Sequence, residues 1–267
     1  MWGWIDQIGQ TLAFLQQPRI VSIELGVNHQ LDNPNSNHGG AIQLLLDDAR
    51  GVIDLDRAKT IFRHEYGHSL FFTNIGKYSN AVRAAVKCSG AIHQFRETIA
   101  ARMPLHKIHT TAPERLNGEQ RRLYQRLTQR VQELAAQVSE FTRADFAMRE
   151  YIELFADFVA VWMADDPKAM AAVTGNEKRD FSLTWNASGW KDQEFHNALS
   201  PTRSHLWKRY CEWGRQDPRR FFDTLLHAVG TRVDAEHASE AEAELPVAKV
   251  NQKLMAQFDI SAKRPES

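Results

Sequence analysis

The sequence predicts an α+β protein with a small N-terminal β-sheet and a mostly helical remainder. Two short β-rich segments, 19–27 and 41–48, lie near the N-terminus. After residue 54 most apolar residues recur every three to four positions, which is the spacing of amphipathic helices. The composition, 43% hydrophobic and 25% charged over 267 residues, is that of an ordinary globular protein with room for one large core or two small ones.

Composition also bounds the function. Lys plus Arg and Asp plus Glu both number 33, so the net charge gives no argument for a nucleic-acid partner or an anionic membrane. The two cysteines, Cys88 and Cys211, are too few for a disulfide framework or a thiolate metal site. No apolar run is long enough to span a membrane. The N-terminus shows no signal peptide, so we expect a cytoplasmic protein or, alternatively, a toxin or effector exported without a cleavable signal.

The N-terminal elements follow from local composition. Apolar spacing over 4–16 predicts a short helix that ends near Pro18. The stretch "RIVSIELGV" (19–27) predicts a strand, which the polar loop "NHQLDNPNSNHGG" then ends. "AIQLLLDD" (41–48) predicts a second strand. A helix should follow, with Asp54 or Asp56 as its N-cap, and this helix carries "RHEYGHSL".

The middle of the chain is rich in charged residues. From 77 to about 110 the pattern is helical but less regular, and His106 and His109 are expected in a loop after Pro104. Segment 113–141 is a long amphipathic helix whose Arg and Gln residues are interpreted as a solvated face rather than a nucleic-acid surface.

The last third is predicted to complete the core. Segment 144–165 is more apolar and reads as a buried helix. Two further helices are expected over 200–214 and 217–230. Residues 234–267 lose hydrophobic density, which predicts a loosely attached helix or tail. The sequence therefore predicts one domain over 1–233, with a helical insertion over about 77–143.

The motif in "RHEYGHSL" predicts a metal site. On a helix, His64 and His68 lie one above the other on one face, where two neutral imidazoles can bind one Zn²⁺. Glu65 lies next to this pair and can take a proton from water whose pKa the ion lowers. The alternative is a surface helix that carries these residues by chance.

A third ligand is expected from the buried helix. The metzincin extension is absent, because Phe71 and Asn74 occupy its positions. Burying two carboxylates among apolar neighbours is costly unless they coordinate or pair. A zinc ion would compensate Glu153, and the N–H of a ligand histidine would compensate Asp157. Glu150 is the fallback ligand.

The combination of His64-Glu65-x-x-His68 with the later Glu153-x-x-x-Asp157 resembles the gluzincin division of the zincin metallopeptidases. The resemblance implies a zincin-like fold, one Zn²⁺ per chain, Glu153 as third ligand and Asp157 as the residue that orients a ligand histidine. Here 84 residues separate His68 from Glu153, far more than in thermolysin-like enzymes. Segment 113–141 would then be an insertion.

The same resemblance implies further parts of the site. A substrate peptide would add to an edge strand, expected at Gly40–Leu46; the alternative is that this segment is an ordinary sheet strand. An oxyanion donor would come from the C-terminal half, where His196 is the first choice and Tyr210 the second; Arg203 and His205 lie nearby. Gly67, inside the motif, either admits the second ligand helix closely or is merely tolerated.

The sequence therefore predicts a zinc-dependent endopeptidase that acts on a protein or peptide substrate, with no nucleic acid partner and no membrane span. The alternative function is a catalytically silent zincin-fold binding or scaffold protein with a structural zinc, for which segment 113–141 would be the partner surface. Hydrolysis of a non-peptide amide would use the same residues.

Overall fold

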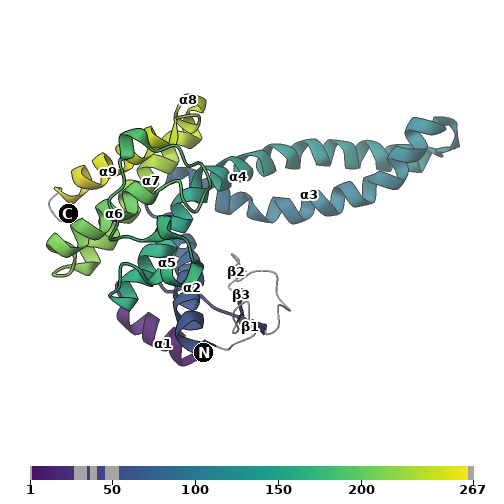
Figure 1. The fold of residues 1–267 in the computed structure, drawn as a ribbon. Helices are drawn as coiled ribbons and strands as arrows, with labels where there is room; N and C mark the ends of the chain where they lie inside the picture. The colour runs from purple at the N-terminus through teal and green to yellow at the C-terminus, as the bar shows by residue number, and fades with distance from the viewer. Residues whose placement is uncertain (1, 27–34, 37–40, 46–53, 264–267) are drawn as a thin grey trace. The chain divides into compact units, whose positions relative to one another are not determined.

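The computed structural model describes residues 2–26, 35–36, 41–45 and 54–263, and it is mostly helical with one small sheet (Figure 1). This agrees with the predicted α+β class. The chain forms two compact units, a core unit (Met1–Ser79 and Met148–Ser267) and a hairpin unit (Asn80–Ala147). The hairpin unit lies close in sequence to the predicted helical insertion over about 77–143.

The sheet contains strands β1 (Ser22–Gly26), β2 (Asn35–Ser36) and β3 (Ala41–Leu45) in the order β1-β3-β2. β1 pairs with β3 in parallel, and β2 pairs with it antiparallel. β3 is therefore central among the described strands, and the expectation that Gly40–Leu46 is an edge strand is wrong. Gly40 and Leu46 themselves lie outside the described residues.

Helix α2 (Leu55–Ile75) carries the histidine motif and follows α1 (Trp2–Thr11) in the helix order. Its N-cap is Asp54, whose Oδ1 accepts hydrogen bonds from the backbone N–H groups of Asp56 (3.1 Å) and Arg57 (2.9 Å). These two contacts satisfy donors that have no partner inside the helix. Of the two predicted caps, Asp54 is thus the one used.

The hairpin unit consists of α3 (Asn80–Thr111), a 3₁₀ turn (Pro113–Arg115) and the first part of α4 (Gly118–Ala164). Figure 1 shows α3 and this part of α4 side by side. The predicted loop after Pro104 is wrong, because α3 continues through this proline. Packing offsets the loss of the proline's hydrogen bond: His106 Nδ1 lies 3.0 Å from the Tyr124 hydroxyl, and the His109 ring is centred 4.5 Å from the Tyr124 ring.

α4 joins two helices that were expected to be separate, 113–141 and 144–165, into one helix of 47 residues. No proline or glycine interrupts the sequence between Gly118 and Pro167, so nothing breaks the backbone hydrogen bonding at the junction. The C-terminal part of α4 enters the core unit, where residues such as Phe155 and Phe158 are fully buried.

The remaining elements of the core unit are α5 (Ala169–Thr174), η2 (Glu177–Arg179), η3 (Ala187–Gly189), α6 (Ser200–Arg209), a π-helical turn (Tyr210–Gly214), α7 (Pro218–Ala238), α8 (Glu240–Ala243) and α9 (Val247–Ala262). α7 continues past Gly230, the predicted end of that helix. A Cβ at Gly230 would lie 2.5 Å from the carbonyl oxygen of Tyr78. This glycine therefore permits a close backbone approach.

The prediction of a loosely attached segment over 234–267 differs from the structure. α9 packs against α7 and buries Val250, Leu254 and Phe258, which are spaced four residues apart along one face. Glu242, on α8, pairs with Arg232 (2.9 Å) and with a lysine of α9. Most of this segment is thus part of the core. None of the helices that the structure describes combines the length and the apolar character needed to cross a lipid bilayer.

Candidate metal centre

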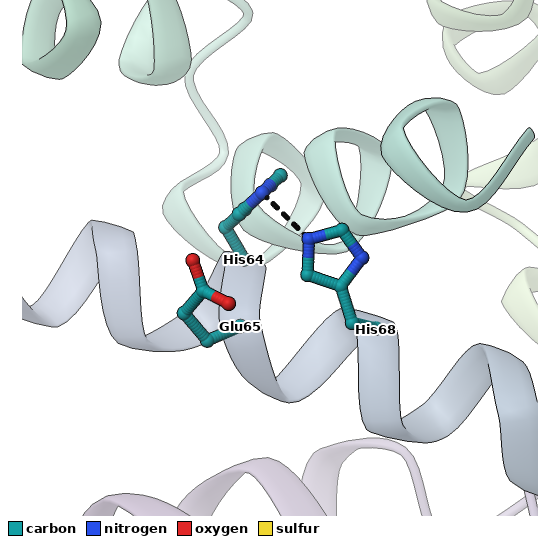
Figure 2. Close-up of side chains that lie close together, drawn as sticks. All are labelled: His64, Glu65 and His68. Atoms are coloured by element: carbon teal, nitrogen blue, oxygen red, sulfur yellow. Dashed lines mark hydrogen bonds between the residues drawn. The ribbon is translucent and has the colours of Figure 1, made fainter. Parts of the chain in front are cut away.

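α2 and the core part of α4 bring the three predicted ligands together. His64 Nε2 and His68 Nε2 lie 2.9 Å apart, and the two rings on α2 are nearly perpendicular, at 82° (Figure 2). The carboxylate of Glu153 approaches both rings, with Oε2 at 3.5 Å from His64 Nε2 and Oε1 at 3.5 Å from His68 Nε2. One nitrogen of each ring and one carboxylate thus converge on a single point.

These separations match a tetrahedral zinc site. With bonds of about 2.0–2.1 Å, two ligand atoms at neighbouring corners of a tetrahedron are about 3.3–3.4 Å apart. The three observed separations, 2.9, 3.5 and 3.5 Å, bracket that value. Two imidazoles and one carboxylate also form a donor set typical of catalytic zinc, which keeps its fourth position for water or substrate. The residues present therefore fit the ion.

Burial keeps the two histidines neutral. Desolvation lowers the pKa of both His64 and His68 to about 4, and for His64 repulsion from His68 adds to this effect. Neutral imidazole has a lone pair for a metal, whereas imidazolium has none. Glu153 Oε2 is buried and accepts no hydrogen bond within the described chain. A bound cation would compensate this otherwise costly oxygen.

Asp157, predicted to orient a ligand histidine, lies in contact with the His64 ring. Its Oδ1 lies 3.0 Å from His64 Nδ1, which places the ring proton on Nδ1 and leaves the lone pair of Nε2 free for the metal. The side chain is fully buried. Burial alone would raise the pKa of Asp157, but Arg179, Arg203 and the His64 hydrogen bond together hold it well below the usual range.

Two buried arginines from different elements form ion pairs with Asp157. Arg179, in η2, donates from Nε to Asp157 Oδ2 (3.1 Å) and from Nη2 to Oδ1. Arg203, in α6, places Nε 2.9 Å and Nη2 2.8 Å from Oδ2. Arg179 also reaches Glu153 Oε2 at 3.6 Å. Arg179 was not among the residues predicted from the sequence, and Arg203 was placed only in the approximate region of an oxyanion donor.

Glu65 is a buried carboxylate beside the two histidines. Its carboxylate lies beside the His64 ring (Figure 2), and the possible ligand atoms of His64, Glu65 and His68 lie within 4.8 Å of one another. Burial, with repulsion from Glu153, raises the pKa of Glu65 to about 8. A nearby divalent cation would lower this pKa again, which suits a group that must both accept and release a proton near neutral pH.

Gly67 sets the distance between the two ligand helices. A Cβ at this position would lie 2.7 Å from Ala156 Cα and 3.2 Å from the Ala156 carbonyl oxygen. Both are shorter than ordinary contacts, so only glycine lets α2 approach α4 this closely. Of the two interpretations of Gly67, a requirement for close helix approach or a merely tolerated glycine, the structure supports the first.

His196 lies at the edge of the candidate centre. Its Nε2 is 3.7 Å from Glu153 Oε2, and its Nδ1 is 2.7 Å from Glu194 Oε1. The loop that carries it is held by two contacts: the Arg149 guanidinium lies 4.5 Å from the centre of the Phe195 ring, and a lysine pairs with Asp192 at 2.6 Å. The ring is partly exposed, so it can meet a ligand from solvent.

The other candidates lie elsewhere in the core unit. Tyr210 packs against Phe158 and Phe221 in an aromatic cluster, so the structure does not bring it to the ligand atoms. His205 pairs with Asp259. The pKa of Glu150, the fallback ligand, is raised by burial and by repulsion from Glu236 on α7; neither histidine contributes to this shift.

Comparison of the chain with protein-family models, with curated proteins and with solved structures finds no match.

Proposed function

We propose that this protein is a zinc-dependent endopeptidase of gluzincin type with a zincin-like fold. The observation that carries the proposal is the convergence of His64, His68 and Glu153 at tetrahedral spacing, with the buried carboxylate of Glu65 beside them. A purely structural zinc site has no use for a buried base next to the ion.

Each side chain has a distinct role in this proposal. When bound, zinc supplies a Lewis acid that polarises a carbonyl and lowers the pKa of water. Glu65 takes the proton of the attacking water and returns it to the leaving amine. Asp157 keeps His64 in the tautomer that can bind metal. His196, whose Nδ1 donates to Glu194, would donate from Nε2 as the imidazolium to the oxygen on which negative charge develops.

The substrate is proposed to be a protein or peptide. The silent binding or scaffold protein with a structural zinc is the alternative function, and it requires the same three ligands without turnover. Zinc content and peptide cleavage must therefore be measured on the same variants.

The first experiment is metal analysis by plasma emission spectrometry. We expect about one zinc per chain in the wild type. Glu153→Ala should lose it, and Glu65→Gln should keep it. Glu150→Ala is the matched control, because it removes a largely buried carboxylate one turn earlier on the same helix without touching the histidines. A wild type without zinc after reconstitution would refute the proposed centre.

The second experiment is cleavage of a quenched fluorescent peptide library. The wild type should cleave, and Glu65→Gln should be slower by about 10²–10⁴-fold although it still holds zinc. His196→Ala should lower kcat by about 10²–10³-fold. A zinc-loaded wild type that cleaves no peptide would favour the silent binding protein.

A further inference from the structure

Although the net charge of the chain is zero, its charged residues are unevenly distributed along the sequence. The hairpin unit, Asn80–Ala147, carries 11 Lys and Arg residues against 6 Asp and Glu residues, while the whole chain carries 33 of each. The excess is greatest at the end of the hairpin, residues 102–126, where the acidic residues are Glu114 and Glu119. The cations of this segment, called here the hairpin tip, are Arg102, Lys107, Arg115, Arg121, Arg122 and Arg126.

No carboxylate among the described residues pairs with any of the six tip cations. Arginines of the core unit behave differently: Arg209 pairs with Asp259 and Glu212, and Arg232 pairs with Glu236 and Glu242. Five of the six tip cations are exposed, and Arg102 is half-buried.

The positions of these cations are also unfavourable for the helix itself. Arg121 and Arg122 lie near the start of α4, where the helix dipole is positive and an acidic residue is preferred. Arg121 has a structural role, because its Nε donates to the carbonyl of Leu116 (3.0 Å). No such bond explains Arg122. An external anion would offset this clustering of positive charge.

Two features of the tip indicate which anion. Met103 and Leu123 are large apolar residues that are 55% and 38% exposed in the same segment as the cations. Cations interspersed with apolar side chains fit the headgroup region of an anionic bilayer. The Tyr124 ring is covered by His109 and stacked by His106, so it does not offer a free face to a nucleic-acid base.

We propose that the hairpin tip binds the phosphate-bearing surface of an anionic lipid membrane, peripherally and without insertion of a helix across it. Five of the six cations are arginines, whose planar guanidinium groups bind phosphate through two hydrogen bonds. Met103 and Leu123 enter the headgroup boundary. This inference is independent of the proposed peptidase activity.

The test is cosedimentation of the full-length protein with vesicles of phosphatidylcholine containing about 30% phosphatidylserine. The tip variant is Lys107→Gln, Arg115→Gln, Arg122→Gln and Arg126→Gln combined. The matched control removes four exposed cations of the core unit: Lys191→Gln, Lys208→Gln, Arg219→Gln and Lys263→Gln. Both variants change the net charge equally. A difference between them therefore shows that binding depends on the hairpin tip and not on the overall charge of the protein.

We expect the tip variant, which loses four cations, to bind these vesicles about 10²–10³-fold more weakly, since each cation near such a surface contributes about fivefold. The control should change binding by less than about threefold. Wild-type binding should weaken steeply between about 50 and 500 mM salt and be absent with phosphatidylcholine alone. Circular dichroism verifies that each variant keeps its helices, and the salt series tests the wild type without any substitution.

A third variant distinguishes lipid from other anions. Met103→Ser with Leu123→Ser should weaken vesicle binding about threefold to tenfold and leave binding to a labelled RNA oligonucleotide unchanged. The proposal is overturned if the wild type does not bind the anionic vesicles at low salt, or if the tip and control variants bind equally. Tighter binding to the RNA than to vesicles would identify the tip as a nucleic-acid surface and would also overturn it.

Discussion

Gly67→Ala tests whether the close approach of two helices builds the candidate metal centre. The added Cβ would lie 2.7 Å from Ala156 Cα, whereas carbon atoms pack at about 3.5–4.0 Å. α2 and α4 must therefore move apart by about 1 Å. The neighbouring atom belongs to the backbone, so a side-chain rotation cannot relieve the contact.

The ligand distances give the expected size of the effect. Glu153 lies 3.5 Å from each histidine nitrogen, already close to the upper value for tetrahedral zinc. A further separation of about 1 Å would place the carboxylate out of reach, and we expect zinc affinity to fall by at least about tenfold. Overpacking should lower the free energy of unfolding of the zinc-free protein by about 1–3 kcal/mol. The better helix propensity of alanine should offset up to about 1 kcal/mol of this loss.

Chelator competition measures the zinc affinity, and urea unfolding of the zinc-free protein measures the stability. Gly90→Ala is the control, because Gly90 is a helical glycine with open space around its added Cβ, and it should be neutral or slightly stabilising. Ala156→Gly should not rescue Gly67→Ala, since the clash is with Cα and the carbonyl oxygen. If Gly67→Ala behaves like Gly90→Ala in both assays, helix approach does not position the site.

Three further substitutions test other parts of the core unit by urea unfolding. Asp157→Asn removes the carboxylate that pairs with both Arg179 and Arg203, and leaves Arg179 only its 3.6 Å contact with Glu153. It should lower the free energy of unfolding by about 3–5 kcal/mol; a loss under about 1 would show that the two guanidinium groups are compensated elsewhere. Burial and repulsion from Glu236 raise the pKa of Glu150 from 4.5 to about 7. The folded protein therefore holds this proton more tightly than the unfolded chain, so the contribution to stability is complete below about pH 4.5 and is lost as the pH rises through about 7. At most about 3 kcal/mol is involved, and Glu150→Gln should remove that part of the pH dependence; parallel pH profiles for wild type and variant would contradict the assignment. Leu254→Ala, in α9, should cost about 2–5 kcal/mol, and a negligible cost would restore the expectation of a loose C-terminal segment.

Local rules explain what could be read from the sequence. The spacing of His64 and His68 fixes their proximity on any helix, and Asp54 follows ordinary capping preferences. Glu153 and Asp157 could be proposed because buried carboxylates need partners, whatever the length of chain between the two helices. These inferences depend on contacts within one or two turns of helix, or on the cost of burying charge.

Other features depended on tertiary packing that the sequence does not display. Arg179 sits in a short 3₁₀ turn with no periodic pattern around it, and only the folded chain brings it to Asp157. The central position of β3 is set by pairing between strands, which alternation of residues cannot specify. Pro104 predicts a helix break by its own chemistry, but contacts with Tyr124 outweigh that preference.

The discontinuous core unit has a consequence for protein synthesis. Its buried residues include Phe62 from α2 and Phe258 from α9, so segments far apart in the sequence contribute to the core of the same unit. The ribosome releases α2 long before α9 has been made, whereas the hairpin unit can complete its contacts while translation continues. His64 and His68 therefore lie in an incomplete core until α9 has emerged from the ribosome. A nascent chain should have no assembled metal centre, and any hydrolytic activity would begin only after translation has passed α9.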